Sequence, residues 1–467
     1  MTSRPVDLFL AVVRDGQRTL GSQIEDQLRC AIRSGALRPA TTVPSTRDLA
    51  RQLDVSRPIV VNAYAQLSAE GYLELRRGAR PRVSSAARRC EAPAATSAFV
   101  EAPLRFDFRP GAPDLSAFPR AAWLRCLRDG LAGMSDADLG YTDPHGSGLL
   151  RSALSDYLGR VRGVMTDPSR VLVTSGFAQG RALIFRALAS HGARRIAIED
   201  PSNSELRDAV APAGLRLVPI PVDDHGIRVD MLARSSADAV VITPAHQYPT
   251  GAVMSGERRA ALLAWLRDRN AIAIEDDYDA EYRYDRAPVG ALQSLDPDRI
   301  VYAGTTSKTL APALRLGWLV VPPRLLNAVM AQQLIFDFGG PRIEQHAFAH
   351  FLARGELDRH LRRMRGRYRV RRDALMTALR ESLPQAAICG VAAGLHATVR
   401  LPDGHDELAI RDAARQQGIG FTTMNEYRVT KASGPPTLVL GYGRCSEETI
   451  HAGVRELATV IRHIRRG

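Results

Sequence analysis

The sequence is poor in cysteine and has no long hydrophobic run. Its few cysteines are odd in number and scattered, which is typical of reduced thiols and argues against a disulfide framework: Cys30, Cys90, Cys126, Cys389 and Cys445. No stretch approaches the ~20 uninterrupted apolar residues that a membrane helix needs, and the apolar run near the N-terminus lacks a small-residue cleavage site. We therefore expect a cytoplasmic protein with neither a signal peptide nor a membrane partner.

Lysine is also nearly absent. It occurs only at Lys308 and Lys431, so any chemistry that requires a lysine amine has two candidates. The other basic residues are arginines, and the formal net charge is +13. Residues 1–100 hold 15 arginines and 9 acidic residues. A basic segment of this kind predicts a polyanionic partner, although charge alone does not distinguish DNA from RNA or a membrane surface.

The chain has 467 residues, 45% of them apolar, which is enough for two or three domains. Residues 84–105, SSAARRCEAPAATSAFVEAPLR, are rich in Ala, Ser and Pro and have no apolar period, so we predict a linker there. The predicted domains are residues 1–83 and 106–467, and the second has a smaller α+β part from about residue 346.

Residues 1–83 have the pattern of a winged helix-turn-helix domain. Apolar residues at helical spacing predict helices over residues 22–35 and 44–53, the second capped by Ser45 or Thr46. A tight turn at 54–56 leads to a third helix over 57–71, with Ser56 as its cap and Pro58 in its first turn. Residues 72–84 alternate and turn at Gly78, which fits a two-stranded wing.

In such a domain the second helix of the pair lies in the major groove, so double-stranded DNA is the predicted partner. Arg57 begins that helix, where a guanidinium can donate two hydrogen bonds to guanine. Ser45 and Arg47 are predicted to contact phosphates. The wing turn is predicted to contact the sugar-phosphate backbone or the minor groove of DNA through Arg76, Arg77, Gly78 and Arg80.

Residues 35–83, GALRPATTVPSTRDLARQLDVSRPIVVNAYAQLSAEGYLELRRGARPRV, resemble the GntR family of winged-helix regulators. The resemblance depends on the order and spacing of helix, turn, recognition helix and wing. It implies a regulator that binds DNA through this domain. Asn62 departs from the family, whose members often carry a basic residue there.

The pattern changes after the linker. Strand-like apolar runs alternate with helix-length segments, at 171–176, 195–200, 239–245, 271–277, 300–305 and 316–321. Such runs indicate a mainly parallel sheet that is covered by helices on both faces. The predicted fold class is therefore a mainly α winged domain joined to an α/β domain with a smaller α+β part.

The segment GTTSKTLAPALRLGW, residues 304–318, carries the strongest chemical signal. The aldehyde of pyridoxal 5'-phosphate forms a Schiff base with a lysine, and Lys308 is one of the two available. Thr305 and Ser307 precede this lysine and Arg315 follows it. Hydroxyl groups and a guanidinium are suited to binding the cofactor's phosphate.

Two further segments extend this candidate cofactor site. The strand at 271–277 ends in acids, and Asp276 is the candidate partner for a protonated pyridine nitrogen. Tyr278 is placed to hydrogen-bond the phenolic oxygen of the ring. The segment VLVTSGFAQG is a strand that opens a helix, which predicts phosphate-binding amides at Gly176, Phe177 and Ala178.

This order of motifs resembles the fold-type I, class I aminotransferases over about residues 106–467. The segment YTDPHGSGLLRSAL is similar to a family segment whose tyrosine, here Tyr141, reaches the neighbouring subunit's cofactor. The two halves together resemble the MocR subfamily of GntR regulators. That resemblance implies a head-to-tail homodimer, pyridoxal phosphate near the subunit interface, and regulation of a vitamin B6- or amino-acid-related gene.

Three positions depart from the aminotransferase enzymes. Tyr248 stands where the enzymes carry an asparagine before Pro-Thr-Gly, and Asn203 stands where an aromatic residue usually stacks on the ring. Phe177 is the alternative for stacking. The late strand TLVLGYG lacks the arginine that holds a substrate carboxylate, and Arg428 and Arg444 are the alternatives for that role.

These features leave three hypotheses. The favoured one is a regulator that senses pyridoxal phosphate, alone or with an amine or amino acid, and has no catalytic residue or metal. The second is an active aminotransferase with an added DNA-binding domain, which would require the missing arginine and aromatic residue. The third is a DNA-binding dimer with a ligand-free scaffold. That hypothesis predicts loss of Lys308, Asp276 and Arg315, all of which are present.

Overall fold

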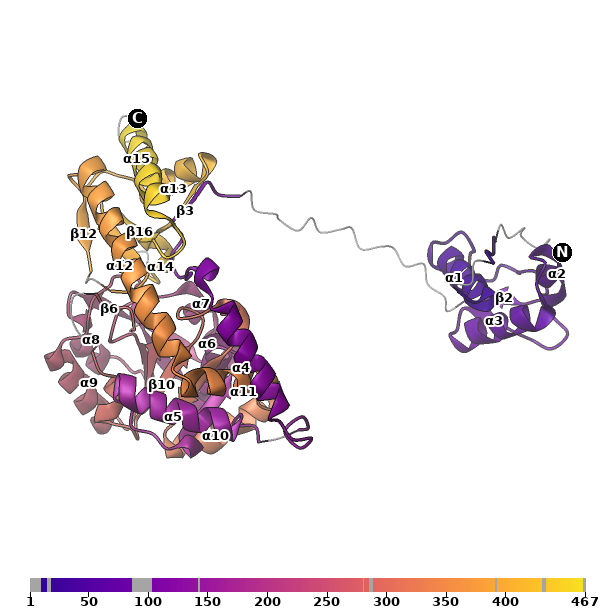
Figure 1. The fold of residues 1–467 in the computed structure, drawn as a ribbon, viewed down its shortest axis with the longest axis horizontal. Coiled ribbons are helices and arrows are strands. Elements are labelled where there is room, and N and C mark those ends of the chain that lie inside the picture. Colours follow the sequence, from indigo (N-terminus) through magenta and orange to yellow (C-terminus); the bar gives the residue numbers. More distant parts are fainter. Residues whose placement is uncertain are drawn as a thin grey trace. The chain divides into compact units, whose positions relative to one another are not determined.

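The chain divides into two compact units, Met1–Glu101 and Ala102–Gly467, shown in a computed structural model (Figure 1). The structure describes residues 10–14, 18–85, 103–141, 143–279, 281–284, 289–390, 393–430 and 434–464. Most of the predicted linker, 86–102, lies outside the described residues, as do Lys431 and Cys90.

Within residues 10–14 and 18–85, the first unit contains three helices and a small wing. The helices are α1 (Leu20–Arg33), α2 (Thr46–Gln52) and α3 (Arg57–Ala69), and strands β1 (Leu73–Glu74) and β2 (Arg82–Val83) pair antiparallel. Apolar residues one helical turn apart in α1 are buried against α3, as the periodicity predicts: Ile24, Leu28 and Ile32. The predicted helix, turn, helix and wing are confirmed.

The ends of α2 and α3 differ in how they are capped. Ser45 caps α2, because its Oγ accepts a hydrogen bond from the amide of Asp48 at 3.2 Å. Ser56 is the N-cap residue of α3, as predicted, but its side chain makes no cap hydrogen bond. Pro58, in the first turn of α3, has no N–H to donate. The buried Tyr64 instead fixes α3, since its hydroxyl donates to the carbonyl of Pro44 at 3.0 Å.

An eight-stranded sheet forms the centre of the second unit, in the order β4-β11-β10-β9-β8-β5-β6-β7. The strands are β4 (Val171–Thr174), β5 (Arg195–Asp200), β6 (Arg216–Asp223), β7 (Gly226–Ile227), β8 (Ala239–Ile242), β9 (Ile272–Asp277), β10 (Ile300–Thr305) and β11 (Gly317–Val320). Neighbours from β10 to β6 are parallel, whereas β11 is antiparallel to both β10 and β4. The predicted mainly parallel sheet is confirmed. The connection 306–316 is too short for the helical crossover that a parallel β11 would need.

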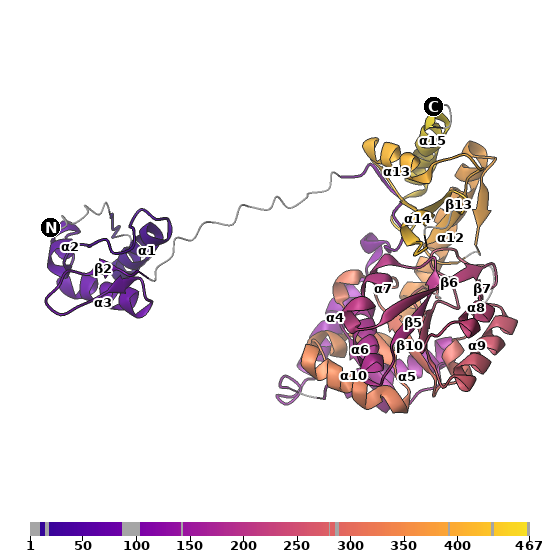
Figure 2. The same ribbon diagram turned by 180° about the vertical axis from the view of Figure 1, so that it is seen from behind.

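Helices cover both faces of this sheet (Figure 2). One face packs on α6 (Phe177–Ser190) and α10 (Pro323–Phe336). The other packs on α5 (Gly148–Arg162) and α11 (Arg342–Ala353) near β4, and on α8 (Val229–Arg234) and α9 (Gly256–Asp268) near β5. The central strands are therefore buried on both sides, which explains their continuous apolar runs.

A smaller antiparallel sheet, β12-β13-β16-β15, forms the C-terminal part. The long helix α12 (Glu356–Ser382) runs to it from the helices of the large sheet (Figure 1). Its strands are β12 (Ala387–Cys389), β13 (His396–Arg400), β15 (Thr422–Thr423) and β16 (Thr437–Gly441). Strand β3 (Phe106–Asp107) pairs with β14 (Ile419–Gly420), so the start of the unit joins the C-terminal part.

The remaining elements connect these layers. The helices are α4 (Arg120–Ala132), α7 (Ser204–Asp208), α13 (Glu407–Gln416), α14 (Met424–Tyr427) and α15 (Glu447–Ile464), and the 3-10 turns are η1 (Leu115–Ala117), η2 (Pro168–Arg170), η3 (Ala211–Ala213), η4 (Leu292–Leu295) and η5 (Pro312–Leu314). Among the described residues, no helix has both the length and the apolarity to span a membrane.

A buried ion pair stabilises the end of β9. Arg162, the last residue of α5, donates from Nε to Oδ2 of Asp277 at 2.7 Å, and both side chains are almost fully enclosed. The hydroxyl of Tyr302 donates to the same oxygen at 2.7 Å, and Nη1 of Arg162 donates to the carbonyl of Val289. Removal of one member of such a pair leaves an uncompensated buried charge.

The Arg162→Leu substitution is therefore expected to lower the free energy of unfolding of the second unit by about 3–5 kcal/mol. Arg160→Leu is the matched control, because Arg160 lies two residues away and pairs with Asp358 on the exposed surface. An exposed pair is expected to contribute under about 1 kcal/mol. Denaturant unfolding of both variants measures the difference, and equal losses would contradict the structural role given to Arg162.

Candidate functional site

The helix-turn-helix unit exposes several arginines without acidic partners. Arg57 is the first residue of α3 and Arg47 lies in the first turn of α2, and both are exposed. Within residues 10–14 and 18–85, no ion pair engages either guanidinium. Ser45 is half-buried and its hydroxyl donates to Asp48 Oδ2 at 2.7 Å, so this residue is already used in capping α2. The two arginines are therefore free to make phosphate or base contacts.

The wing turn carries the other predicted contacts. Gly78 has a φ of +78°, a left-handed conformation that favours glycine, and open space surrounds it. Arg76, Arg77 and Arg80 are exposed on either side of this turn. Arg76 lies 3.7 Å from Glu74 and Arg80 lies 3.9 Å from Asp48, which are weak surface pairs that a polyanion can replace.

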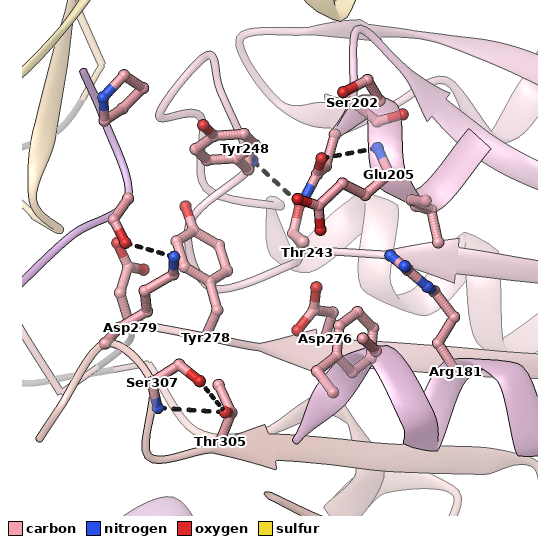
Figure 3. A pocket seen from close by; sticks show the side chains of 18 of the residues that line it. Arg181, Ser202, Glu205, Thr243, Tyr248, Asp276, Tyr278, Asp279, Thr305 and Ser307 are labelled. Carbon is pink, nitrogen blue, oxygen red and sulfur yellow. Dashed lines mark hydrogen bonds between the residues drawn. The ribbon is translucent and has the colours of Figure 1, made fainter. Parts of the chain in front are cut away.

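In the second unit a cavity of about 500 Å³ lies at the carboxyl ends of the parallel strands (Figure 3). This edge is where open α/β sheets bind ligands. The predicted cofactor residues that line it are Phe177, Ala178, Asp276, Tyr278, Thr305, Ser307, Lys308 and Arg315. Two predicted residues do not line it: Gly176, which lies just behind it, and Tyr141. The structure therefore brings eight of the ten residues together around one space.

Lys308 follows β10 and projects into this cavity. Its ammonium group donates to the carbonyl of Gly111, and Asp276 and Asp279 also lie near enough to attract its charge. Burial nevertheless lowers the pKa of Lys308. A lysine with a lowered pKa is more often unprotonated, and the neutral amine is the form that attacks a carbonyl carbon.

An anion cradle lies at the N-terminus of α6. Gly176 precedes the helix with a φ of +85°, and a side chain there would approach Nη2 of Arg315 to 3.0 Å. Arg315 itself donates to the carbonyl of Ser175 at 2.7 Å. The hydroxyl of Thr305 donates to the hydroxyl of Ser307 at 3.0 Å (Figure 3). Helix amides, two hydroxyls and a guanidinium together form a set of donors that suits a phosphate group.

The two adjacent acids at the end of β9 have different environments. Asp277 is used in the ion pair with Arg162, whereas Asp276 opens onto the cavity. Burial, followed by the charge of Asp277, raises the pKa of Asp276 to about 8. A carboxyl group in this state has a strong need for a hydrogen-bonding or cationic partner. A protonated heterocyclic nitrogen would supply one.

Tyr278 lines the cavity, but its hydroxyl is not free. It donates to the carbonyl oxygen of His246 at 3.0 Å. Nδ1 of His246 in turn lies 3.1 Å from both carboxylate oxygens of Asp279, which is buried. His396 packs beside this histidine, with ring centroids 5.3 Å apart. The predicted hydrogen bond from Tyr278 to a ring oxygen would therefore compete with its bond to His246.

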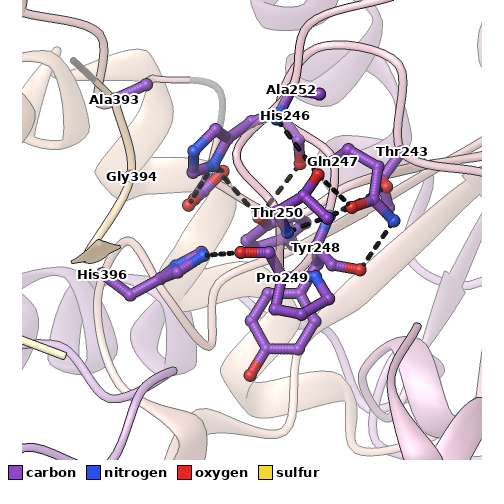
Figure 4. Close-up of polar contacts among 12 residues, drawn as sticks. Thr243, His246, Gln247, Tyr248, Pro249, Thr250, Ala252, Ala393, Gly394 and His396 are labelled. Carbon is purple, nitrogen blue, oxygen red and sulfur yellow. Dashed lines mark hydrogen bonds and ion pairs between the residues drawn. The ribbon is translucent and has the colours of Figure 1, made fainter. Parts of the chain in front are cut away.

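The loop that carries Tyr248 is held by a network of hydrogen bonds (Figure 4). Gln247 links the loop to strand β5, since its Oε1 accepts from Thr250 within the loop and its Nε2 donates to Glu199 of β5 at 3.1 Å. Burial raises the pKa of Glu199 to about 7. The hydroxyls of Tyr248 and Tyr427 lie 2.9 Å apart, so the loop also contacts the C-terminal part. Tyr248 is thus fixed as a wall of the cavity.

The positions that depart from the enzymes have local roles. Asn203 caps α7, since its Oδ1 accepts from the amide of Glu205 at 3.0 Å. Arg444 pairs with Asp107 at 2.6 Å, and Arg428 lines a separate cavity. Neither arginine lines the cavity of Lys308. The two alternatives proposed for carboxylate binding are therefore not placed for that role in this chain.

Polar cavity residues that the sequence analysis did not predict include Arg181, Ser202 and Glu205. Nε of Arg181 and Oγ of Ser202 are buried and have no hydrogen-bond partner among the described residues. Arg181 could have been found, because it lies one helical turn after Phe177 and so shares its face of α6. Ser202 and Glu205 follow β5, at the same sheet edge as Asp276 and Lys308.

Comparison with known families agrees with this division. The family "Bacterial regulatory proteins, gntR family" matches residues 20–83, and "Aminotransferase class I and II" matches residues 111–456. Among solved structures, the multiple substrate aminotransferase of Thermococcus profundus superposes with a TM-score of 0.71 at 26% identity, over 78% of this chain and 93% of that one.

Full-length relatives combine the same two domains. The chain is 31% identical to the pyridoxine biosynthesis transcriptional regulator PdxR of Corynebacterium glutamicum, over 97% of this chain and 99% of that protein. It is 32% identical to the probable rhizopine catabolism regulatory protein MocR of Rhizobium meliloti, over 96% and 95% respectively. Fold and site thus define a helix-turn-helix protein that carries an aminotransferase-like domain. The chain belongs to the MocR-type branch of the GntR family of bacterial regulators.

The raised pKa of Asp276 predicts how the free energy of unfolding of the ligand-free protein depends on pH. As pH rises from about 4 to 8, the unfolded chain loses this proton while the folded chain retains it, so the wild type loses stability across that window. Asp276→Asn cannot ionise, and its free energy of unfolding is expected to exceed that of the wild type by an amount that grows up to about pH 8 and then levels off. Denaturant unfolding at pH 5, 7 and 9 measures this difference, and a constant difference would contradict it.

Proposed function

We propose that this protein is a cytoplasmic transcription regulator that binds DNA through residues 1–83 and senses pyridoxal 5'-phosphate through residues 106–467. One observation carries the proposal. A single chain has a helix-turn-helix with unpaired exposed arginines and a cavity where Lys308 and Asp276 enter the same space. The names of its relatives support regulation of a vitamin B6- or amino-acid-related gene.

The cavity residues fit this cofactor. Pyridoxal phosphate, when bound, supplies an aldehyde that condenses with primary amines. Lys308 would hold the aldehyde end and Asp276 the ring nitrogen, while Tyr278 would face the phenolic oxygen. The amides at Phe177 and Ala178, with Thr305, Ser307 and Arg315, would hold the phosphate. The buried Arg181 Nε and Ser202 Oγ, which lack partners, also favour a polar occupant of this cavity.

A homodimer is the proposed functional form. Tyr141 is 96% exposed and its ring packs on Phe338, with centroids 5.9 Å apart. Other large apolar side chains are exposed on α4, in the segment before Tyr141 and at the end of α10: Leu124, Leu131, Leu139, Ile335 and Phe336. Exposed apolar groups of this size favour burial against a second subunit. Tyr141 would then reach the partner's cofactor in a head-to-tail arrangement.

An aminotransferase reaction is the second candidate, because the fold and Lys308 are those of the enzymes. The structure does not support this reaction where a substrate carboxylate would bind. Strand β16 carries no arginine, and neither Arg428 nor Arg444 lines the cavity. Asn203 offers no aromatic ring, although Phe177 lines the cavity and can contact the cofactor. The site therefore favours binding and sensing over repeated transamination.

Lys308→Ala is expected to abolish the visible absorbance of the lysine-bound cofactor, because no other amine projects into the cavity among the residues that line it. Borohydride reduction of the wild type followed by peptide mapping locates the cofactor on Lys308. A reduced adduct on Lys431 would contradict the assignment.

Sustained transamination of common amino acids near ~10 turnovers per second would favour the enzyme instead.

Two arginine variants separate base reading from phosphate binding. Arg57→Ala is expected to cost about 1–3 kcal/mol at one base position and to relax the preference there. Arg76→Ala is expected to weaken binding to all sequences alike and to reduce its salt dependence, since a phosphate contact releases a counterion whatever the base. Titration of labelled operator and random DNA at several salt concentrations measures both effects.

The control for these variants is Arg33→Ala, which removes an exposed arginine from α1, outside the helix-turn-helix pair. It should bind DNA nearly as the wild type does. Losses for Arg57→Ala and Arg76→Ala that are equal on both DNAs and independent of salt would contradict the contact assignments. Absence of DNA binding under every condition would contradict the proposed function.

A further inference from the structure

Arg181 is a charged residue in the cavity to which the proposed function gives no role. It projects from α6 and lines the cavity together with Asp276 (Figure 3). Its Nε is buried and has no hydrogen-bond partner among the residues described. A buried polar group without a partner destabilises a protein, so its presence indicates an interaction made in the functional state.

The position of Arg181 restricts what that interaction can be. In Figure 3 Arg181 lies next to Asp276. Lys308 comes from another part of the wall, the turn after β10. Asp276 would meet the ring nitrogen, and the aldehyde carbon lies directly across a pyridine ring from that nitrogen. Arg181 is therefore at the wrong end of the ring to hold the carboxylate of an amino acid bound at the aldehyde.

The charges around Asp276 come from several elements. Asp277 and Asp279, on and just after β9, oppose its ionisation. Arg181 on α6 and Lys308 after β10 favour it, and Arg181 has the larger effect of the two. Arg181 is itself faced by Glu205 and Asp208 of α7. Because Lys308 is assigned to the cofactor's aldehyde, Arg181 remains as the permanent cation beside this carboxyl group.

We propose that Arg181 is the charge partner of Asp276 and sets the pH at which the proton shared by this carboxyl group and the cofactor's ring nitrogen is lost. The proposal rests on the proposed pyridoxal phosphate site. Arg181 acts through Asp276 and is a positioning residue. Its positive charge favours the unprotonated pair, so the proton is lost at a lower pH than it would be without the arginine.

This arrangement has a consequence for the site's chemistry. A pyridine nitrogen that carries a proton withdraws electrons from the rest of the ring, and one without a proton withdraws fewer. Arg181 thus weakens the electron withdrawal on which transamination depends, while it leaves the aldehyde free to bind an amine. Such a site favours binding of an amine over its transamination. The absence of a carboxylate-binding arginine from β16 has the same effect.

The test compares full-length wild type with Arg181→Leu, which removes the charge, and Arg181→Lys, which retains it. Pyridoxal phosphate affinity is measured by equilibrium dialysis from pH 6 to 10. In Arg181→Leu the midpoint at which affinity falls is expected to rise by about one pH unit. Arg181→Lys is expected to restore most of the wild-type midpoint. Arg186→Leu, at an exposed position on the same helix, is the matched control and should leave the midpoint unchanged.

Asp276→Asn tests whether the effect passes through this carboxyl group. With that substitution the affinity profile should lose the transition, and adding Arg181→Leu should then shift nothing. An unchanged midpoint in Arg181→Leu, or a shift that persists in the Asp276→Asn background, would overturn the proposal.

A second measurement separates this inference from the proposed function. The pH dependence of unfolding of the cofactor-free protein reports Asp276 directly, and Arg181→Leu should move its upper limit to higher pH. If the wild type binds no pyridoxal phosphate, the proposed function fails, and this measurement still decides whether Arg181 is the charge partner of Asp276. If the cofactor binds and neither pH profile moves, only the role of Arg181 is overturned.

Discussion

The alternation of side chains along strand β9 determines the shape and charge of the candidate cofactor site. Successive residues of a strand point to opposite faces, so Asp276 and Asp277 cannot share an environment. Asp277 is enclosed with Arg162 and Tyr302 and fixes the strand's end. Asp276 therefore lies at the edge of the sheet, where it is largely buried but faces the cavity. A cationic or hydrogen-bonding group in the cavity can contact it there. The turn after β10 places Lys308 in the same space.

The rest of the cavity is arranged around Asp276 and Lys308. Residues from α6 and Arg315 supply the anion cradle, and the loop carrying Tyr248 forms a wall through Gln247 and Tyr427. The helix-turn-helix unit has a core of its own, and its α3 is fixed by Tyr64. One chain thus combines a ligand cavity with a DNA-binding surface, and a dimer would present two copies of each.

Much of this was predictable from the sequence, because periodicity and motif order determine which elements form and where they end. The three helices of the first unit, the mainly parallel sheet and eight of the ten cofactor residues at one cavity follow from such patterns. The failures involve partners that are distant in the sequence. The lack of a cap bond from Ser56, the bond from Tyr278 to His246 and the pairing of Arg444 with Asp107 depend on tertiary contacts. Arg181 was missed because a lone arginine on a helix carries no motif.

If the cavity of Lys308 senses pyridoxal phosphate for the DNA-binding unit, the cofactor must change the affinity of the protein for its operator. Labelled operator is titrated with full-length wild type and with Lys308→Ala, each with and without pyridoxal phosphate. We expect the cofactor to change the operator affinity of the wild type by about fivefold or more and to leave that of Lys308→Ala unchanged. Equal affinities with and without the cofactor in the wild type, or a cofactor effect that survives in Lys308→Ala, would contradict it.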